Sequence, residues 1–219
     1  MSAFATQLVN LCAAVLLMVT FVMISQRRIV TLIHLYTLQG LTLVVAACVV
    51  AWVSGQPHLY GSAALTLALK VVLIPLLLHR AVNRLNVRWD VETLINIPTM
   101  MIIGIVLVVF AFNLTLPIAR LSAAIAPGTL GIALACVLLS FMMMITRAKA
   151  VPQVIGFLSM ENGLFFAATA ATYGMPMVVE LGIALDVLVG LLILGVFMFQ
   201  IRAQFDSLDI RQLEKLKGD

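Results

Sequence analysis

Long apolar stretches alternate with short polar breaks along the chain. A helix needs about 20 apolar residues to cross the roughly 30 Å hydrocarbon core of a bilayer. Seven stretches of about this length are separated by charged residues, prolines or glycines. We therefore expect an all-α integral membrane protein with seven transmembrane helices, at residues 5–24, 29–53, 60–78, 97–116, 121–145, 151–172 and 178–201.

The composition leaves little room for a soluble domain. Of the 219 residues, 63% are hydrophobic and 10% are charged, and the mean hydropathy is +1.18, whereas a soluble domain carries about 25% charged residues. The net charge of +4 would suit nucleic acid, but the basic residues fall between the apolar stretches. We expect contacts with membrane lipids and no nucleic-acid partner.

The connections between the stretches carry very uneven positive charge. Lys and Arg are retained on the cytoplasmic side of a membrane protein. One side holds eleven basic residues: Arg27, Arg28, Arg80, Arg84, Arg88, Arg147, Lys149, Arg202, Arg211, Lys215 and Lys217. The other side holds only Arg120, and Lys70 lies inside a stretch. This split predicts an outside N-terminus and a cytoplasmic C-terminus.

The three cysteines give no sign of a cofactor. Cys12, Cys48 and Cys136 all fall inside predicted helices, where thiols pack as small hydrophobic side chains. Their spacing offers neither a disulfide framework nor a Cys-x-x-Cys metal motif. We expect no metal and no cofactor in this chain.

Two short similarities suggest an internal repeat. Residues 38–41 (LQGL) resemble 161–164 (ENGL), and residues 68–71 (ALKV) resemble 184–187 (ALDV). The first three helices would then repeat as the fifth to seventh, in the same direction, with the fourth helix returning the chain. Chance similarity between apolar helices is the alternative. The repeat gives these expected domains: 1–80, 81–120 with the fourth helix, 121–203, and a cytoplasmic tail at 204–219.

Three ionisable residues fall near the middle of predicted helices: Lys70, Glu161 and Asp186. Each costs on the order of 2.5 to 3.5 kcal/mol in a bilayer centre, so each needs a partner or a purpose. Pro75 cannot donate a backbone hydrogen bond to Val71, which loosens the helix next to Lys70. These groups are suited to lateral proton transfer, because a neighbouring charge changes their affinity for protons. A buried pair that only fixes helix packing is the alternative.

Other polar residues extend this series toward the two surfaces. His34 and Gln39 lie in the second helix, and Glu180 opens the seventh. Histidine titrates near neutral pH and is a candidate relay, although a lone histidine in a helix is more often a hydrogen-bonded packing residue, which is the alternative for His34. His58 and His79 lie at helix ends and are interpreted as solvated.

Four segments resemble hydrogenase-4 component E, a membrane subunit of formate hydrogenlyase-type, group 4 NiFe hydrogenase complexes. They are Met160 to Gly163, Val179 to Ala184 leading to Asp186, Leu208 to Ile210 with Leu216 to Gly218, and Lys70 to Pro75. Each predicted repeat is also similar to the three-helix K subunit of complex I and the C subunit of cation/proton antiporters. That family carries one Glu in its second helix and another in its third. Glu161 and Asp186 match those positions, whereas the first repeat has Leu38 and Lys70 there.

The resemblance implies a membrane-arm subunit of a complex I-like, energy-converting complex in the inner (cytoplasmic) membrane. Its relay residues would be Glu161, Asp186, Lys70, His34, Gln39 and Glu180. Its partners would be antiporter-like membrane subunits and redox subunits. The redox subunits would be hydrogenase and iron-sulfur chains, which carry the cofactors, the electron transport and the catalysis. One alternative is a purely structural subunit of the same complex. The other is a stand-alone carrier or a rhodopsin, although a retinal lysine would be expected in the last helix, where Asp186 stands.

Overall fold

The computed structural model describes residues 3–55, 58–85, 93–119 and 128–172, together with residues 188 and 195. The described part is helical, apart from an isolated bridge between Thr93 and Arg147. Its elements are α1 (Ala3–Ser25), α2 (Ile29–Ser54), α3 (His58–Thr66), the π-helical η1 (Leu67–Leu73), α4 (Ile74–Leu85), α5 (Ile97–Ala119), α6 (Thr129–Thr146) and α7 (Ala150–Thr172).

Five of these helical segments are long and apolar enough to cross a membrane: Phe4–Ser25, Ile29–Ser54, Leu59–Arg80, Ile97–Pro117 and Thr129–Thr146. The third segment combines α3, η1 and α4, which follow one another without a break. These five segments correspond to predicted helices one to four and, from Thr129 onward, to the fifth. The sixth predicted helix has its helical counterpart in α7 (Ala150–Thr172), which is not among the five membrane-length segments. The seventh predicted helix and the tail at 204–219 lie outside the described residues.

The third helical segment is longer than the sequence analysis predicts. The prediction ends at residue 78, whereas α4 continues to Leu85. Leu78 and Val82 are four residues apart and both buried, so they form an apolar face of α4. Arg80 lies on the other face of the helix. An amphipathic pattern extends a helix beyond its uniformly apolar part, which explains the difference.

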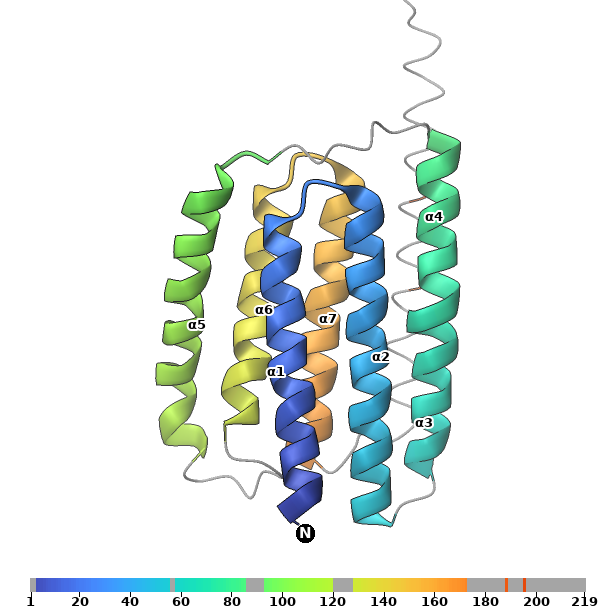
Figure 1. The fold of residues 1–219 in the computed structure, drawn as a ribbon, viewed down its shortest axis with the longest axis vertical. Helices are drawn as coiled ribbons and strands as arrows, with labels where there is room; N and C mark the ends of the chain where they lie inside the picture. The colour runs from blue at the N-terminus through green and yellow to red at the C-terminus, as the bar shows by residue number, and fades with distance from the viewer. Residues whose placement is uncertain are drawn as a thin grey trace, which may run out of the picture.

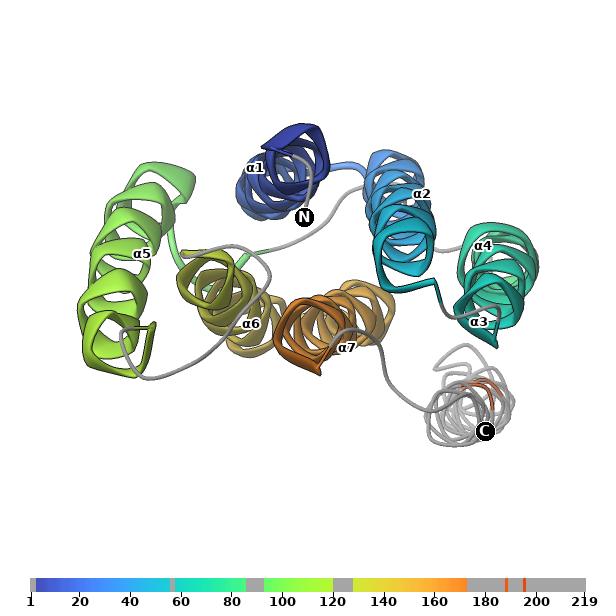
Figure 2. The same cartoon turned by 90° about the horizontal axis from the view of Figure 1, so that it is seen from below.

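The helices pack as two rows (Figure 2). One row contains α1, α2 and α3 with α4, and the other contains α5, α6 and α7. The rows touch where α1 packs on α6 and α2 packs on α7. Figure 1 shows that the α1–α2 and α6–α7 connections lie at the same end of the bundle. The basic residues of these two connections therefore share one end, as the predicted orientation requires, and the membrane side of that end stays a prediction.

Close contact between α6 and α7 depends on glycine. A Cβ atom on Gly163 would lie 3.0 Å from Val137 Cγ2 and 3.2 Å from the Val137 backbone nitrogen. Gly156, two turns earlier on α7, would meet the Met144 backbone nitrogen at 3.2 Å. Small residues let membrane helices approach closely, and Gly156 and Gly163 allow this approach of α7 to α6.

The outer surfaces of the bundle are apolar. Large hydrophobic side chains are exposed along the helices, including Leu11, Met18, Val45, Trp52, Leu76, Ile105, Phe110, Phe141 and Leu164. The buried interior instead contains polar and charged side chains alongside the apolar clusters. This arrangement suits a helical bundle surrounded by lipid, since intramembrane polar groups face the bundle interior.

Candidate functional site

A buried ion pair joins the two rows of helices. Lys70 Nζ of η1 donates a hydrogen bond to Glu161 Oε1 of α7 at 2.6 Å. The two side chains are 4% and 9% exposed. Both residues were predicted as intramembrane charges, and the structure brings them into direct contact. An opposite charge offsets part of the cost of burying each group.

The backbone around Lys70 is a π-helix because of Pro75. Pro75 has no N–H group, so the regular hydrogen bond from this position to Val71 is missing. The Ile74 N–H binds the Leu69 carbonyl five residues earlier, which is the π-helical pattern. The predicted loosening of the helix before Pro75 is confirmed, and Lys70 lies in the middle of the widened segment.

Glycine brings α2 up against the same segment. A Cβ atom on Gly40 would lie 3.3 Å from Val71 Cγ2 and 3.4 Å from Lys70 Cβ. Such contacts are tighter than most Cβ atoms make. Gly40 therefore lets α2 sit directly beside the lysine, and the neighbouring Gln39 is buried in the same region.

A line of hydrogen bonds runs from the Lys70 ammonium across the bundle, through neutral amides and hydroxyls. Lys70 Nζ also donates to Asn162 Oδ1 at 3.2 Å, and Asn162 Nδ2 donates to Gln39 Oε1 at 3.3 Å. Gln39 Nε2 donates to Thr20 Oγ1 at 2.7 Å and to Ser159 Oγ at 3.0 Å. The line thus connects η1 through α7 and α2 to α1.

The network ends on α6. The Ser140 and Ser159 hydroxyls lie 2.8 Å apart, so α6 is linked to α7 beside the close glycine contacts. Asn162 and both serines are at most 1% exposed. Polar networks in a low-dielectric interior stabilise one arrangement when every member finds a partner.

Phe165 completes the surroundings of the lysine. Lys70 Nζ lies 5.1 Å from the centroid of the Phe165 ring, one helical turn after Glu161 on α7. A cation over an aromatic face is stabilised by the ring quadrupole. The ammonium group therefore has a carboxylate, an amide oxygen and an aromatic ring as neighbours.

Not all predicted site residues join this network. Gln39 does, through Asn162. His34 is exposed on α2, and its ring centroid lies 5.8 Å from that of His79 on α4. His79 was interpreted as solvated, but it is half-buried and faces another histidine. Asp186 and Glu180 lie outside the described residues.

Several participants were missed in the sequence analysis. Asn162 was noted only as part of a motif, and Thr20, Ser140, Ser159 and Phe165 were not considered. Ser159 and Asn162 are three residues apart on α7, which places them on one helical face. That spacing next to Glu161 is the signal that would have identified them. Thr20 and Ser140 are single hydroxyls in apolar helices, where a hydroxyl usually binds its own backbone.

Arg147 has a structural role that its charge did not reveal. It was predicted as a cytoplasmic basic residue, yet it is fully buried at the end of α6. Its guanidinium donates to the carbonyls of Gln26, Met23 and Ile24 at 2.9, 3.0 and 2.8 Å. Burial lowers the pKa of Arg147 to about 10, so it stays charged at neutral pH and satisfies the last carbonyls of α1.

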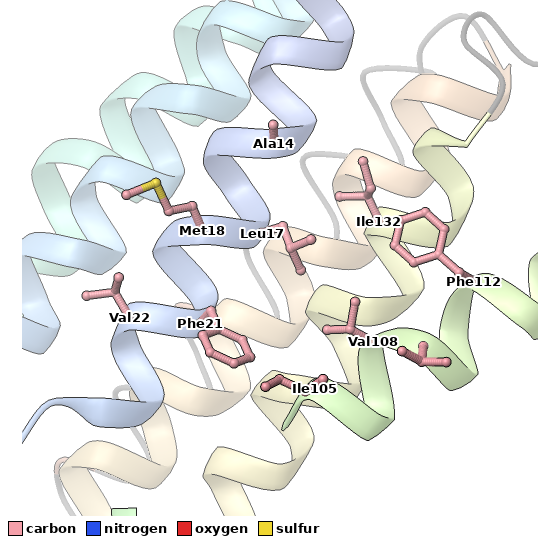
Figure 3. A pocket seen from close by; sticks show the side chains of 10 residues that line it. Ala14, Leu17, Met18, Phe21, Val22, Ile105, Val108, Phe112 and Ile132 are labelled. Atoms are coloured by element: carbon pink, nitrogen blue, oxygen red, sulfur yellow. The ribbon is translucent and has the colours of Figure 1, made fainter. Parts of the chain in front are cut away.

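An apolar groove of about 470 Å³ lies between α1 and α5 (Figure 3). Its lining is Ala14, Leu17, Met18, Phe21, Val22, Ile105, Val108, Val109, Phe112 and Ile132. These side chains offer no hydrogen-bonding or titratable group. The groove is therefore separate in chemistry from the ion pair, and it suits a hydrocarbon chain.

Within the described residues, no group of three or more His, Cys, Asp or Glu side chains could hold a metal ion. The arrangement that stands out is instead a buried acid and base linked to neutral amides. Such a pair can exchange a proton when the field around it changes.

Comparisons with known proteins give distant, full-length relatives. The chain is 29% identical to the uncharacterized protein Rv0085 of Mycobacterium tuberculosis, over 96% of both chains. It is 22% identical to hydrogenase-4 component E of Escherichia coli, over 97% of this chain and 99% of the relative, and equally similar to the Shigella flexneri protein of that name. No family model and no solved structure matches the chain. The chain is thus a multi-pass membrane protein and a distant full-length homologue of hydrogenase-4 component E.

Proposed function

We propose that this chain is a membrane subunit of a hydrogenase-type, complex I-like assembly, in which it contributes to proton or cation movement coupled to redox chemistry on partner subunits. The observation that carries the proposal is the buried Lys70–Glu161 pair at 2.6 Å. The full-length homology to hydrogenase-4 component E supports the kind of complex.

The pair can act as a switch for a proton. While Lys70 is in contact, the Glu161 carboxylate is neutralised by the ammonium group. If a charge on a neighbouring helix draws Lys70 away, the carboxylate loses its counter-ion and binds a proton, because an isolated carboxylate is costly in a membrane. When Lys70 returns, that proton is released. The redox reaction on the partner chains would supply the energy for this cycle.

The other predicted residues have defined places in this proposal. Asp186 would exchange charge with Glu161 from the seventh helix, and Glu180 and His34 would lie toward the two surfaces. Gln39 does not titrate, so we assign it the role of holding the Asn162 amide in place. Asn162 then presents its oxygen to Lys70, which fixes the paired position of the lysine.

A structural subunit is the second candidate, and a specific observation favours it. The neutral hydrogen bonds of Gln39, Asn162, Ser159 and Ser140 connect α2, α7 and α6, as expected of a network that fixes helix packing. A stand-alone carrier, the third possibility, predicts that the chain is purified without partners.

Two measurements test the proposal. A tagged chain is first purified in mild detergent, and co-purifying antiporter-like and redox subunits are identified by mass spectrometry. The complex is then reconstituted in vesicles with E161Q or E161D. We expect E161Q to lower proton movement per redox turnover by at least about tenfold, with unchanged subunit composition, and E161D to retain most of it. A complex that loses subunits in E161Q, or pumps normally, identifies a structural role.

A further inference from the structure

Some buried polar atoms in the described part of the chain have no hydrogen-bond partner: Tyr36 Oη, Ser62 Oγ, Arg147 Nε and Glu161 Oε2. A buried polar atom without a partner costs about 1 to 3 kcal/mol. Native proteins usually satisfy such atoms with another group or with ordered water. Two of these atoms, on Tyr36 and Glu161, belong to the surroundings of the ion pair.

Tyr36 lies on α2, the helix that packs against the Lys70 segment η1. It precedes by four residues Gly40, whose backbone lies against Lys70. On α7, Leu158 packs in the same buried cluster as Tyr36 and precedes Glu161 by three residues. Tyr36 and Glu161 therefore both belong to the junction at which α2, η1 and α7 pack together.

The opposite side of the pair is already saturated. Glu161 Oε1 accepts from Lys70, and the lysine is further held by the Asn162 amide and the Phe165 ring. Asn162 is in turn bound to Gln39. Around the ion pair, Glu161 Oε2 and Tyr36 Oη are thus among the buried atoms of the described residues that still lack a partner.

We propose that ordered water binds between Tyr36 Oη and Glu161 Oε2. A water molecule donates one hydrogen bond to the carboxylate oxygen and accepts the Tyr36 hydroxyl proton in a second. Two to four polar partners are what a buried water requires, and both partners here are nine-tenths buried or more. Tyr36 is thereby a positioning residue for Glu161.

The water site deepens the proposed function, because it places a proton carrier at the free oxygen of the acid. Only that consequence rests on the proposed function. The water site itself is a property of the folded chain, and it stands or falls independently of whether E161Q alters proton movement.

Solid-state NMR of the full chain in lipid bilayers tests the proposal. Magnetisation is transferred from water protons to ¹³C-labelled Glu161 Cδ and Tyr36 Cζ, and the build-up is compared with that of buried Leu16 and Leu32 methyl groups. We expect both labelled carbons to build up at least about twofold faster than the methyl groups. Equal rates would overturn the proposal. Slow build-up with a direct Tyr36–Glu161 hydrogen bond would overturn it too.

Y36F is the matched variant, and Y60F is its control because Tyr60 is 48% exposed. We expect Y36F to slow water transfer to Glu161 Cδ at least about twofold, and Y60F to leave it unchanged. An unpaired hydroxyl predicts instead that Y36F changes nothing. If Y36F does not fold, the wild-type measurement still decides the proposal.

Discussion

Gln39 and Asn162, which occupy corresponding positions in the proposed repeat, bind each other in the core, with Asn162 Nδ2 donating to Gln39 Oε1 at 3.3 Å. Each is followed by a glycine in close contact with a neighbouring helix: Gly40 approaches η1 and Gly163 approaches α6. Two copies related by a local two-fold axis would place equivalent residues together in this way. The contact agrees with the predicted repeat, which itself stays a prediction. It also joins the first half of the chain to the second.

This contact predicts non-additive losses of stability. Q39L and N162L should each lower the free energy of unfolding by about 0.6 to 1.7 kcal/mol, the range of hydrogen bonds between membrane helices. The double variant should lose less than the sum, because each single change leaves the other amide unpaired. Unfolding titrations in detergent measure all three. T37V is the control, because the Thr37 hydroxyl binds only its own helix, and additive losses would show that the amides are not coupled.

For the ion pair, we expect a larger loss of stability when Lys70 alone is neutralised than when both partners are. K70Q should lower the free energy of unfolding by about 3 to 5 kcal/mol, because it leaves a buried carboxylate without its counter-ion. Adding E161Q should restore much of that loss, since two neutral amides can bind each other. Thermal unfolding of K70Q, E161Q and the double variant measures this. A double variant that is less stable than K70Q would contradict the expected coupling.

The π-helical segment predicts that Pro75 acts through Lys70. P75A restores an N–H group to the backbone, so the segment 67–73 can return to α-helical pairing. That change rotates Lys70 relative to α4 and draws its ammonium away from Glu161. We expect P75A to keep or raise the melting temperature while lowering coupled proton movement by at least about tenfold. Unchanged coupling in P75A would show that the π-helix does not position the lysine.

The sequence was sufficient for five membrane-length helices and for the buried charges Lys70 and Glu161, because apolar length and intramembrane charge are strong local signals. Lys70 and Glu161 were both identified, although they are 91 residues apart. The sequence did not decide which acid pairs with Lys70, since Asp186 was as good a candidate as Glu161. Which acid meets a lysine depends on helix rotation and depth, and these arise from packing between distant segments.

The neutral part of the site was the harder part to predict. Thr20 and Ser140 carry no charge, and a hydroxyl in a membrane helix usually binds its own backbone, as Thr20 also does with Leu16. Their role depends on Gln39 and Ser159 arriving from other helices. The burial of Arg147 was not predicted for a related reason, because charge counting does not distinguish a solvated arginine from one buried against carbonyls.

Arg147 predicts a geometry-specific effect on stability. Its guanidinium binds three carbonyls at the end of α1, and a lysine ammonium cannot match this planar arrangement. R147K should therefore lower the free energy of unfolding by about 1.5 to 3 kcal/mol, the value of a charged hydrogen bond. R28K is the control, because Arg28 is exposed. Equal stability of both variants would show that charge alone matters at position 147.

The orientation of the bundle can be tested without the complex. The basic connections at 26–28 and 147–149 lie at one end (Figure 1), and the excess of Lys and Arg predicts that this end faces the cytoplasm. Seven predicted helices would then bring the C-terminus to the same side. We expect green fluorescent protein fused after residue 219 to fluoresce, and alkaline phosphatase fused after residue 124 to be active. A fluorescent fusion after residue 124 would reverse the orientation, and a dark C-terminal fusion would contradict an odd number of spans. His34 and His79 both lie near the basic end of their helices. The outcome therefore also decides which side of the membrane they face and from which compartment protons would reach them.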